Sequence, residues 1–457
     1  MGFMDSLFGT KSNSAFETLI SNTLKSSEHL NAVRSADPAK ESLSKDMFAK
    51  YGKLRGRDLF FNFIGSGRGH GPYVELIDGS VKLDLINGIG INVLGHSHPE
   101  ILKASVCGAL SDVVMQGNLQ PNQEYGQVLE KLVEVSARGS RLKYAWLTTC
   151  GAMAGENALK MARQKTNGAR KVIAMENAFA GRSTIMAEIT DNPAFREGLP
   201  TYDEVLRIPF YNKHDPESSQ KALEMLNKHI EENKNNICVF CFEPMQGEGG
   251  YNVAPREYFI PLFESCRKAN IPIWFDEVQT FCRTTEFYAF QTLKLGEYVD
   301  ITTVAKSLQG AATLYTEELN PKAGLVSGTF AGSSSALASS KAVMDILDND
   351  GYMGPQGKIQ KIHNEFKQML NEINESGPCK GLLREAEGMG LMIGVIPLDG
   401  SKEKMMLLNK KLFNNGIICF GCGRGPFKLR FLLPAILETK HIQEAKVILQ
   451  KSILECL

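Results

Sequence analysis

Residues 273–279 read IWFDEVQ, a short apolar run that ends abruptly in polar side chains. An apolar run of this length is typical of a strand inside a covered sheet. In open α/β sheets, ligands bind beyond the carboxyl ends of parallel strands. We therefore expect Asp276, at the end of the run, and Gln279, three positions later, to face a ligand.

The same pattern recurs on both sides of this stretch. Further apolar runs occupy residues 144–149, 172–175, 237–242, 301–304 and 324–326. Segments with helical spacing of apolar residues lie between them, at 154–165, 220–232 and 258–269. Strands that alternate with helices predict an α/β fold, with a mainly parallel sheet covered by helices on both faces.

The two ends of the chain have a different character. Residues 16–30 show helical spacing within a mixed segment, which predicts an N-terminal arm. Glycines alternate from 65 to 71, and this pattern predicts a turn before a hairpin. A long helical pattern begins near residue 336, and the remainder predicts helices with a few strands. We expect a large α/β domain over residues 76–336 and a smaller α+β domain over residues 337–457.

Composition argues against several classes of partner. The chain has 457 residues with 51 basic and 51 acidic side chains, so no net charge favours nucleic acid. No apolar run approaches the roughly 20 residues that span a bilayer, and no secretory signal is visible. We therefore expect a cytoplasmic protein that binds small molecules or a second copy of itself. Gly2 with Ser6 matches a short myristoylation pattern that carries little weight.

Ten cysteines in a chain of this length do not predict a disulfide scaffold. Two Cys-x-x-Cys pairs occur, and one of them, Cys238 with Cys241, lies within an expected strand. Residues three apart on a strand point to opposite faces, so this pair is not expected to chelate one ion. We predict buried thiols and no metal site.

Polar or glycine-rich segments follow five successive apolar runs. Gly151 opens a helix after the first run, Phe179 follows the second, Glu243 the third, Asp276 the fourth and Lys306 the fifth. Any one of these residues alone would be an ordinary solvated loop residue. Their recurrence at the same edge of the predicted sheet indicates one shared ligand site.

The chemistry of these side chains fits a single cofactor. A helix that starts at Gly151 points free N–H groups and the positive end of its dipole at a phosphate. A carboxylate such as Asp276 holds a pyridine nitrogen protonated, which turns the ring into an electron sink. Lys306 is able to condense with an aldehyde and later to act as a general base, and Phe179 is able to stack on a flat ring.

With these residues the chain resembles the class III (ω-type) aminotransferases, which use pyridoxal 5'-phosphate. The resemblance runs from about residue 63 to 442 through motifs in the family's order: 83–99, 151–160, 179–182, 243–250, 276–279, 305–308, 328–332 and 429–431. It implies a fold type I transferase whose small domain is built from both ends of the chain, so that residues 1–75 join residues 337–457.

The resemblance also implies roles for individual residues. The cofactor-binding set is Gly151, Ala152, Phe179, Glu243, Asp276, Val278, Gln279, Lys306 and Thr329. Gly151 and Ala152 contact the phosphate, Phe179 and Val278 sandwich the ring, Asp276 pairs with the ring nitrogen, and Gln279 contacts the phenolic oxygen. Thr329 reaches the phosphate of a neighbouring subunit, which implies a homodimer with shared sites.

The implied catalytic set is Lys306, Asp276, Glu248 and Arg430. Lys306 carries the cofactor as a Schiff base and moves the proton. Arg430 binds the α-carboxylate of 2-oxoglutarate, and Glu248 occupies Arg430 when the amino donor is bound. The pair is physically sensible, because an unpaired buried guanidinium would be costly.

Several segments depart from the family pattern and leave alternatives open. Ala180 stands where the family has histidine, and residues 281–285, 309–313 and 333–335 lack the usual glycines or proline. The resemblance implies a donor of the 4-aminobutyrate, acetylornithine or ornithine, or lysine type, and these departures leave the choice among them open. An aminomutase, a decarboxylating transaminase and a non-catalytic binding protein remain alternatives. The Glu248–Arg430 pair argues against the mutase, and retention of Lys306 argues against the binding protein.

Overall fold

The computed structural model describes residues 3–61 and 63–457, so Gly2 of the myristoylation pattern lies outside the described residues. Its centre is a seven-stranded sheet. In spatial order the strands are β4 (Tyr144–Thr148), β10 (Ala311–Tyr315), β9 (Ile301–Val304), β8 (Ile273–Asp276), β7 (Ile237–Phe242), β5 (Lys171–Met175) and β6 (Val205–Ile208).

The direction of the strands confirms the mainly parallel sheet. β9, β8, β7, β5 and β6 pair in parallel, whereas β10 is antiparallel to both of its neighbours. Because β10 is reversed against both β4 and β9, β4 runs in the same direction as the parallel strands. The carboxyl ends of all strands except β10 therefore share one edge of the sheet.

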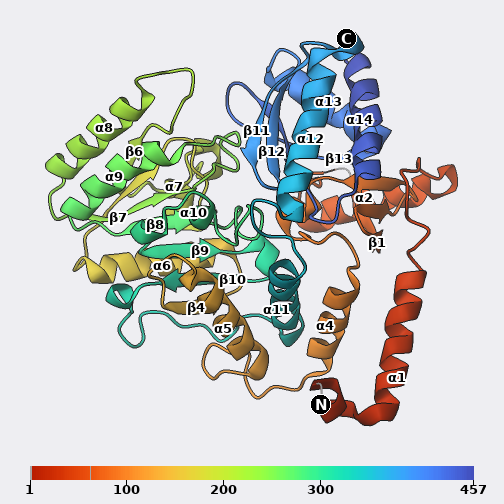
Figure 1. The fold of residues 1–457 in the computed structure, drawn as a ribbon, viewed down its shortest axis with the longest axis horizontal. Helices are drawn as coiled ribbons and strands as arrows, with labels where there is room; N and C mark the ends of the chain where they lie inside the picture. Colours follow the sequence, from red (N-terminus) through yellow and green to blue (C-terminus); the bar gives the residue numbers. More distant parts are fainter. Residues whose placement is uncertain (1–2, 62) are drawn as a thin grey trace.

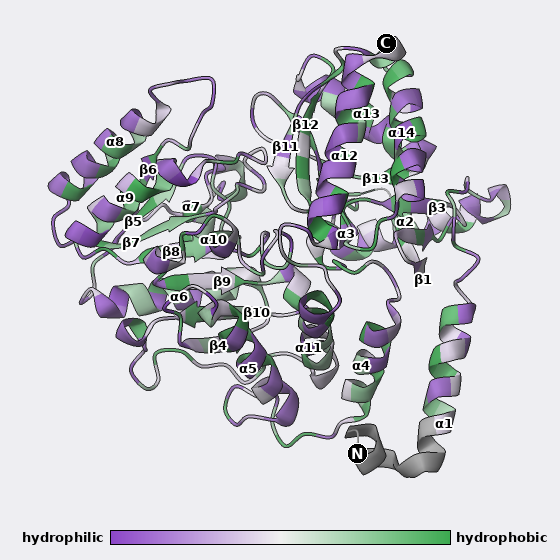
Figure 2. Cartoon of the chain, viewed as in Figure 1, coloured by the Kyte–Doolittle hydropathy of each residue, from purple (hydrophilic) through white to green (hydrophobic). Residues whose placement is uncertain are grey.

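Helices cover both faces of this sheet (Figure 1). α6 (Gly151–Lys165) lies on one face, and α8 (Ser218–Glu232) and α9 (Arg256–Lys268) lie on the other. Alternate residues of β7 enter two cores: Phe242 packs with Phe263 of α9, whereas Val239 packs with Leu159 of α6. Figure 2 shows the apolar strands between helices with hydrophilic outer faces.

Two of the strand predictions were wrong or incomplete. Residues 324–326 form a turn and bends, and the strand next to β9 is β10. The sequence AATLY of β10 carries small residues and a threonine, so it lacked the strongly apolar run that marks the other strands. β6 was also missed, because Arg207 interrupts its short apolar run.

The cysteine argument also needs correction. The pairing of β7 with β5 shifts register between Lys171 and Val172, which skips Cys238. Cys238 therefore falls in the same core cluster as Cys241 instead of on the opposite face. Both are buried thiols without a disulfide. Within residues 3–61 and 63–457, no group of three or more His, Cys, Asp or Glu is placed to hold a metal ion.

Two smaller sheets complete the fold, and the first of them unites both ends of the chain. One has the order β1 (Gly65–His70), β2 (Tyr73–Leu76), β3 (Val81–Asp84) and β13 (Ile417–Ile418), and the other has the order β11 (Leu383–Met389), β12 (Met392–Pro397), β15 (Lys428–Leu432) and β14 (Phe420–Cys422). The alternating glycines thus form a strand of the hairpin and not a turn before it. The parallel pairing of β3 with β13 is the join between the two ends.

The remaining helices surround these sheets. α12 (Lys358–Glu375), α13 (Lys402–Asn415) and α14 (Thr439–Leu454) cover the C-terminal sheet. α11 (Ser334–Asn349) starts as predicted and packs on α4 (Pro99–Leu110) and α5 (Gln123–Ala137). The other helical segments are α1 (Phe3–Lys25), α2 (Glu41–Arg55), α3 (Asn87–Gly90), α7 (Thr184–Ile189) and α10 (Ala289–Thr292).

The division into residues 1–75, 76–336 and 337–457 stays a proposal. Its first boundary falls between the paired strands β2 and β3, so one sheet has strands on both sides of the boundary. Across the described part of the chain, no helix combines the length and apolarity needed to cross a bilayer.

The aromatic core between α9 and the sheet generates a stability prediction. Phe263 is fully buried against Phe242 and Phe275. We expect Phe263→Ala to lower the free energy of unfolding by about 3–5 kcal/mol, because it leaves a cavity in a packed core. Phe60→Ala removes the same side chain at a site that is 87% exposed, and we expect a change within about 0.5 kcal/mol. Urea unfolding measures both, and equal losses would contradict this account.

Candidate active site

The strand ends that the sequence singled out meet at one cavity of about 410 Å³. It is lined by eight of the predicted residues: Gly151, Ala152, Phe179, Glu243, Asp276, Val278, Gln279 and Lys306. They lie at the ends of β4, β5, β7, β8 and β9 or in the segments that follow directly, at the shared edge of the sheet. Of the remaining predictions, Glu248 and Arg430 lie beside this cavity, and Thr329 is exposed on the surface.

The first turn of α6 forms one end of the cavity. Cys150 is the N-cap and provides no side-chain hydrogen bond, so the N–H groups of the first turn are available to an anion. Gly151 is needed there, because a Cβ atom at this position would lie 3.0 Å from both methyl groups of Val278. The Gly151 backbone therefore lies close to the Val278 side chain. The space in front of these two residues fits a phosphate group beside a flat ring.

Asp276 ends β8 and is buried at the floor of the cavity. The Val278 N–H donates to Asp276 Oδ1 at 3.0 Å. Burial raises the pKa of Asp276 to about 6, although the Val278 N–H and the nearby Lys306 favour the charged form. The raised pKa means that the charged form of Asp276 has too little positive charge around it. A protonated ring nitrogen would provide that positive charge.

Glu243 connects two loops through hydrogen bonds to their backbones. Its Oε1 accepts from the Phe179 N–H at 3.0 Å, and its Oε2 accepts from the Gly247 N–H at 2.9 Å. Burial and the adjacent Asp276 raise the pKa of Glu243 to about 8. The carboxyl group therefore joins the Phe179 backbone to that of Gly247, and burial favours its neutral form.

The Gln279 side chain also faces the cavity. Its Oε1 is buried and has no hydrogen-bond partner among the described residues. A buried amide without a partner is unfavourable unless a ligand completes its bonding. This orphaned group, the helix start at Gly151 and the uncompensated Asp276 together fit a phosphorylated pyridine ring such as pyridoxal phosphate.

Lys306 follows β9 in a backbone conformation that is uncommon for a residue with a side chain, with φ of 52°. Gln309 has a φ of 59° in the same turn, and its side-chain amide donates to the Ile91 carbonyl at 2.8 Å. Burial lowers the pKa of Lys306 to about 8, and the positive charge of Arg430 adds to the effect. A larger neutral fraction makes this amine a better nucleophile towards an aldehyde.

Glu248 and Arg430 form an ion pair through Oε1 and Nη1. The Arg430 side chain is 5% exposed and that of Glu248 is 36% exposed. Burial would lower the pKa of Arg430, but Glu248 and Tyr251 hold it above its usual value. The pair is asymmetric: Arg430 is embedded on β15, whereas Glu248 lies on a glycine-flanked loop with access to solvent.

Arg283 is a residue near the site that sequence reasoning missed. It is 1% exposed, and its Nη1 donates to the Gln279 carbonyl at 3.1 Å. Burial lowers its pKa to about 10, and its charge contributes to the low pKa of Lys306. Arg283 stands in the mixed segment TFCRTT after the DEVQ motif, which gives no local signal of burial, and only the fold shows that its guanidinium bonds back to the Gln279 carbonyl.

Comparisons with known proteins decide the family. The family model described as "Aminotransferase class-III" matches residues 57–453. The chain belongs to the class III aminotransferases. This family depends on pyridoxal phosphate, so the chain is a pyridoxal-phosphate-dependent transferase.

The class III relatives share most of the chain. It is 31% identical over 392 residues to the acetylornithine aminotransferase of Methanocaldococcus jannaschii, covering 82% of this chain and 89% of the relative. It is 28% identical to the diaminobutyrate–2-oxoglutarate transaminase of Wolinella succinogenes, covering 85% and 91%. The lysine aminotransferase of M. tuberculosis has the same fold, with a TM-score of 0.79 at 20% identity, covering 90% of this chain and 100% of that one. The fold type I architecture is therefore confirmed.

The low pKa of Lys306 generates a test in the cofactor-free protein. We expect acetic anhydride to label Lys306 with a pH midpoint near 8, because burial and Arg430 disfavour the ammonium form. Arg430→Met removes one positive charge and should move the midpoint upwards. Mass spectrometry of the labelled peptide gives the midpoint. A wild-type midpoint of about 10.4, the pKa of an unperturbed lysine, would be inconsistent with this environment.

Proposed function

We propose that this class III enzyme moves the distal amino group of an ω-amino or diamino acid to 2-oxoglutarate by a ping-pong mechanism. The observation that carries the proposal is the Glu248–Arg430 ion pair beside Lys306. The donor leaves as an aldehyde in the first half-reaction, and the keto acid leaves as glutamate in the second. The names of the relatives, acetylornithine and diaminobutyrate transaminases, support a donor with a distal amine.

The protein side chains have distinct tasks in this reaction. Bound pyridoxal phosphate supplies an aldehyde and an electron-withdrawing ring. Lys306 Nζ would hold the cofactor through its aldehyde carbon and, as a free amine, would take up the proton of the amine-bearing carbon of the donor. Asp276 would keep the ring nitrogen protonated. Phe179 and Val278 both line the cavity, where their apolar side chains would exclude water from the ring.

The ion pair explains how one site accepts two kinds of substrate. An ω-amino donor presents its distal amine to Lys306 and carries no carboxylate next to that amine. Glu248 then satisfies the charge of Arg430. A 2-oxo acid brings a carboxylate beside its keto carbon, and this carboxylate replaces Glu248 on Arg430. The glycines at 247, 249 and 250 allow Glu248 to move away.

The alternatives fit this pair less well. An aminomutase has no second substrate with a different carboxylate position, so it has no use for an exchangeable partner of Arg430. A non-catalytic binding protein has no need of an amine whose pKa is lowered to about 8. The choice among 4-aminobutyrate, acetylornithine, ornithine and lysine types is the purpose of the experiment below.

A homodimer with shared sites belongs to the same proposal. Thr329 is exposed, and large apolar side chains are exposed near it and at the cavity mouth: Ile91, Val114, Met115, Leu119, Met153 and Phe330. Gln116 bridges to Phe330, so two of these segments lie side by side. Exposed apolar surface of this kind is typical of protein interfaces. We also propose a cytoplasmic location, since none of the cysteines in the described residues forms a disulfide.

The experiment that tests the function is an absorbance spectrum of the purified protein with a panel of ω-amino donors. We expect a cofactor band that one donor bleaches and 2-oxoglutarate restores. Lys306→Ala should lose the exchange by a factor of about 10² to 10⁴, since it removes the general base. A protein that takes up the cofactor but is bleached by none of the donors would overturn the donor assignment.

The role of Arg430 is tested by a split between the two half-reactions. We expect Arg430→Gln to raise the KM for 2-oxoglutarate by about tenfold to a hundredfold, because a charge-assisted hydrogen bond is lost. The rate with the ω-amino donor should change far less. Arg170→Gln, at a side chain that is 67% exposed, is the control and should alter neither value. An equal loss of rate in both half-reactions would contradict the proposed exchange of Glu248 for the substrate carboxylate on Arg430.

Sharing of sites is tested by mixing two inactive variants. Lys306→Ala lacks the anchoring amine, and Thr329→Glu places a negative charge where the neighbouring phosphate is expected. In a mixed dimer, one site carries both defects and the other carries neither. We therefore expect co-expression to recover activity. If Thr329 served its own subunit, each site would carry one defect and mixing would recover nothing.

A further inference from the structure

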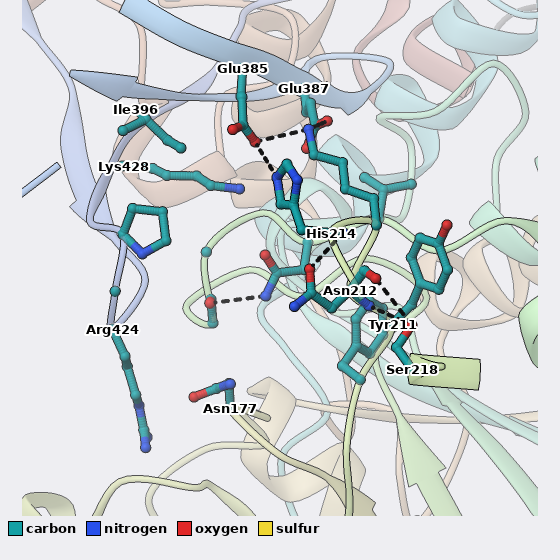
Figure 3. Close-up of a pocket in the computed structure, with 18 of the residues that line it drawn as sticks. Asn177, Tyr211, Asn212, His214, Ser218, Glu385, Glu387, Ile396, Arg424 and Lys428 are labelled. Carbon is teal, nitrogen blue, oxygen red and sulfur yellow. Dashed lines mark hydrogen bonds and ion pairs between the residues drawn. The ribbon is translucent and has the colours of Figure 1, made fainter. Parts of the chain in front are cut away.

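A second cleft, of about 890 Å³, lies between the C-terminal sheet and the loops that follow β5 and β6. Figure 3 shows its walls: Asn177, Tyr211 and Asn212 on one side, and Glu385, Ile396 and Lys428 on the other. None of the predicted cofactor or catalytic residues lines it. A concave site of this size accommodates a small organic ligand.

Most of the carboxylates in the cleft already have cationic partners. Lys213 Nζ lies 2.8 Å from Glu385 Oε2 and also pairs with Glu387, and His214 Nε2 lies 3.2 Å from Glu385 Oε2. Lys221 Nζ lies 2.8 Å from Asp215 Oδ2. Asp399 accepts from the Ser401 N–H, and Glu176 is exposed at the edge of the cleft. Lysine and histidine side chains of the cleft itself therefore neutralise most of its carboxylates.

Lys428 has no such partner. It is 7% exposed, yet its side chain forms no ion pair or hydrogen bond with any residue in the ranges 3–61 and 63–457. Figure 3 shows its ammonium group directed into the cleft past Ile396. The ammonium group opens onto the cleft, and a bound anion would give it the partner that the described residues do not supply. Arg424 comes from the same wall, but Figure 3 shows its side chain directed towards Asn177 and not towards Lys428, and among the described residues it pairs with Asp191 at 3.7 Å.

The cleft shares a wall with the Glu248–Arg430 pair. Lys428 and Arg430 are two positions apart on β15, so their side chains leave the same face of the sheet. The Gly423 N–H donates to the Glu248 carbonyl at 3.0 Å, and Gly249 and Gly250 line the cleft. The segment that carries Arg424 is thus bonded to the residue that pairs with Arg430.

We propose that this cleft binds a small anion with carboxylate or phosphate groups on Lys428, and that the bound anion stabilises the Glu248–Arg430 pair. The anion holds the segment around Gly423 and the glycine loop in the arrangement in which Glu248 occupies Arg430. It therefore disfavours the keto acid, which has to displace Glu248. This regulatory consequence rests on the proposed function, whereas binding of the anion does not.

Binding is tested directly by isothermal calorimetry on the cofactor-loaded enzyme, with citrate and inorganic pyrophosphate as the two probes. We expect at least one to bind, and the stronger one tells whether carboxylate or phosphate is the preferred group. Lys428→Met keeps the buried stem and removes the charge, so the affinity should fall about tenfold or more. Lys221→Met, whose amine is already paired with Asp215, is the matched control and should change affinity less than about twofold.

Two results would overturn the site: no heat of binding from either probe at millimolar concentration, or equal affinity of wild type and Lys428→Met. The second result would mean that the anion binds elsewhere, for example on Arg430 itself. Thermal unfolding of each variant shows whether it is folded, so loss of binding through misfolding is recognised separately.

The coupling is tested by kinetics with the probe that binds. We expect it to raise the KM for 2-oxoglutarate without slowing the donor half-reaction, and 2-oxoglutarate should weaken its binding by the same factor. If the anion binds in calorimetry but the KM for 2-oxoglutarate is unchanged, the proposed coupling is wrong, whereas the anion site itself is still supported. If the enzyme used no donor in the spectral assay, the calorimetric result would still stand, so failure of the function and failure of the site are distinguishable.

Discussion

Backbone hydrogen bonds between β7, β8 and β9 hold three strand ends side by side, and the active-site cavity depends on this alignment. The register places Phe242 opposite Phe275 and Asp276 opposite Thr303, so the chain leaves each strand at nearly the same level. Glu243 follows Phe242 directly, Asp276 is the last residue of β8, and Lys306 comes three positions after Thr303. The apolar cores on the two faces keep the strands in register, because a slip by one residue would turn each buried side chain to the opposite face.

The cavity that results is electrostatically incomplete. Burial raises the pKa of Asp276 and Glu243, and it lowers the pKa of Lys306. Each shift marks a group whose charged form lacks solvent or a sufficient partner. A cofactor with a phosphate, a protonated nitrogen and an aldehyde supplies the missing partners. The free energy that the fold spends on burying these groups is thus recovered when the cofactor binds, and this links the stability of the site to its occupancy.

Arg430 and Lys428 extend the same principle to the outer side of the site. Both cations lie on β15, and the fold buries both. Glu248 satisfies Arg430 from a glycine-flanked loop, whereas Lys428 faces the second cleft and has no ion-pair partner among the described residues. The proposed anion site at Lys428 and the Glu248–Arg430 pair are connected through the hydrogen bond between the backbones of Gly423 and Glu248.

Sequence reasoning succeeded where chemistry and local pattern agree. The apolar runs of β4, β5, β7, β8 and β9 predicted the sheet, and the polar residues that follow them predicted the cavity. It failed where the structure depends on pairing with distant strands. β10 has a weak apolar signal and forms because β4 and β9 offer hydrogen bonds on both of its edges. Cys238 changed faces because of a register shift that only the partner strand imposes.

The order of the motifs along the chain by itself determined the fold class, the family and eight of the residues that line the cavity. Strand ends and turn residues are local features, and parallel strands bring them to one edge in any sheet of this kind. Only the tertiary structure decided that Arg283 turns back under Gln279 and that Lys428, without an ion-pair partner among the described residues, faces a cleft. Both outcomes depend on burial and on the distances between charges, which a linear sequence does not contain.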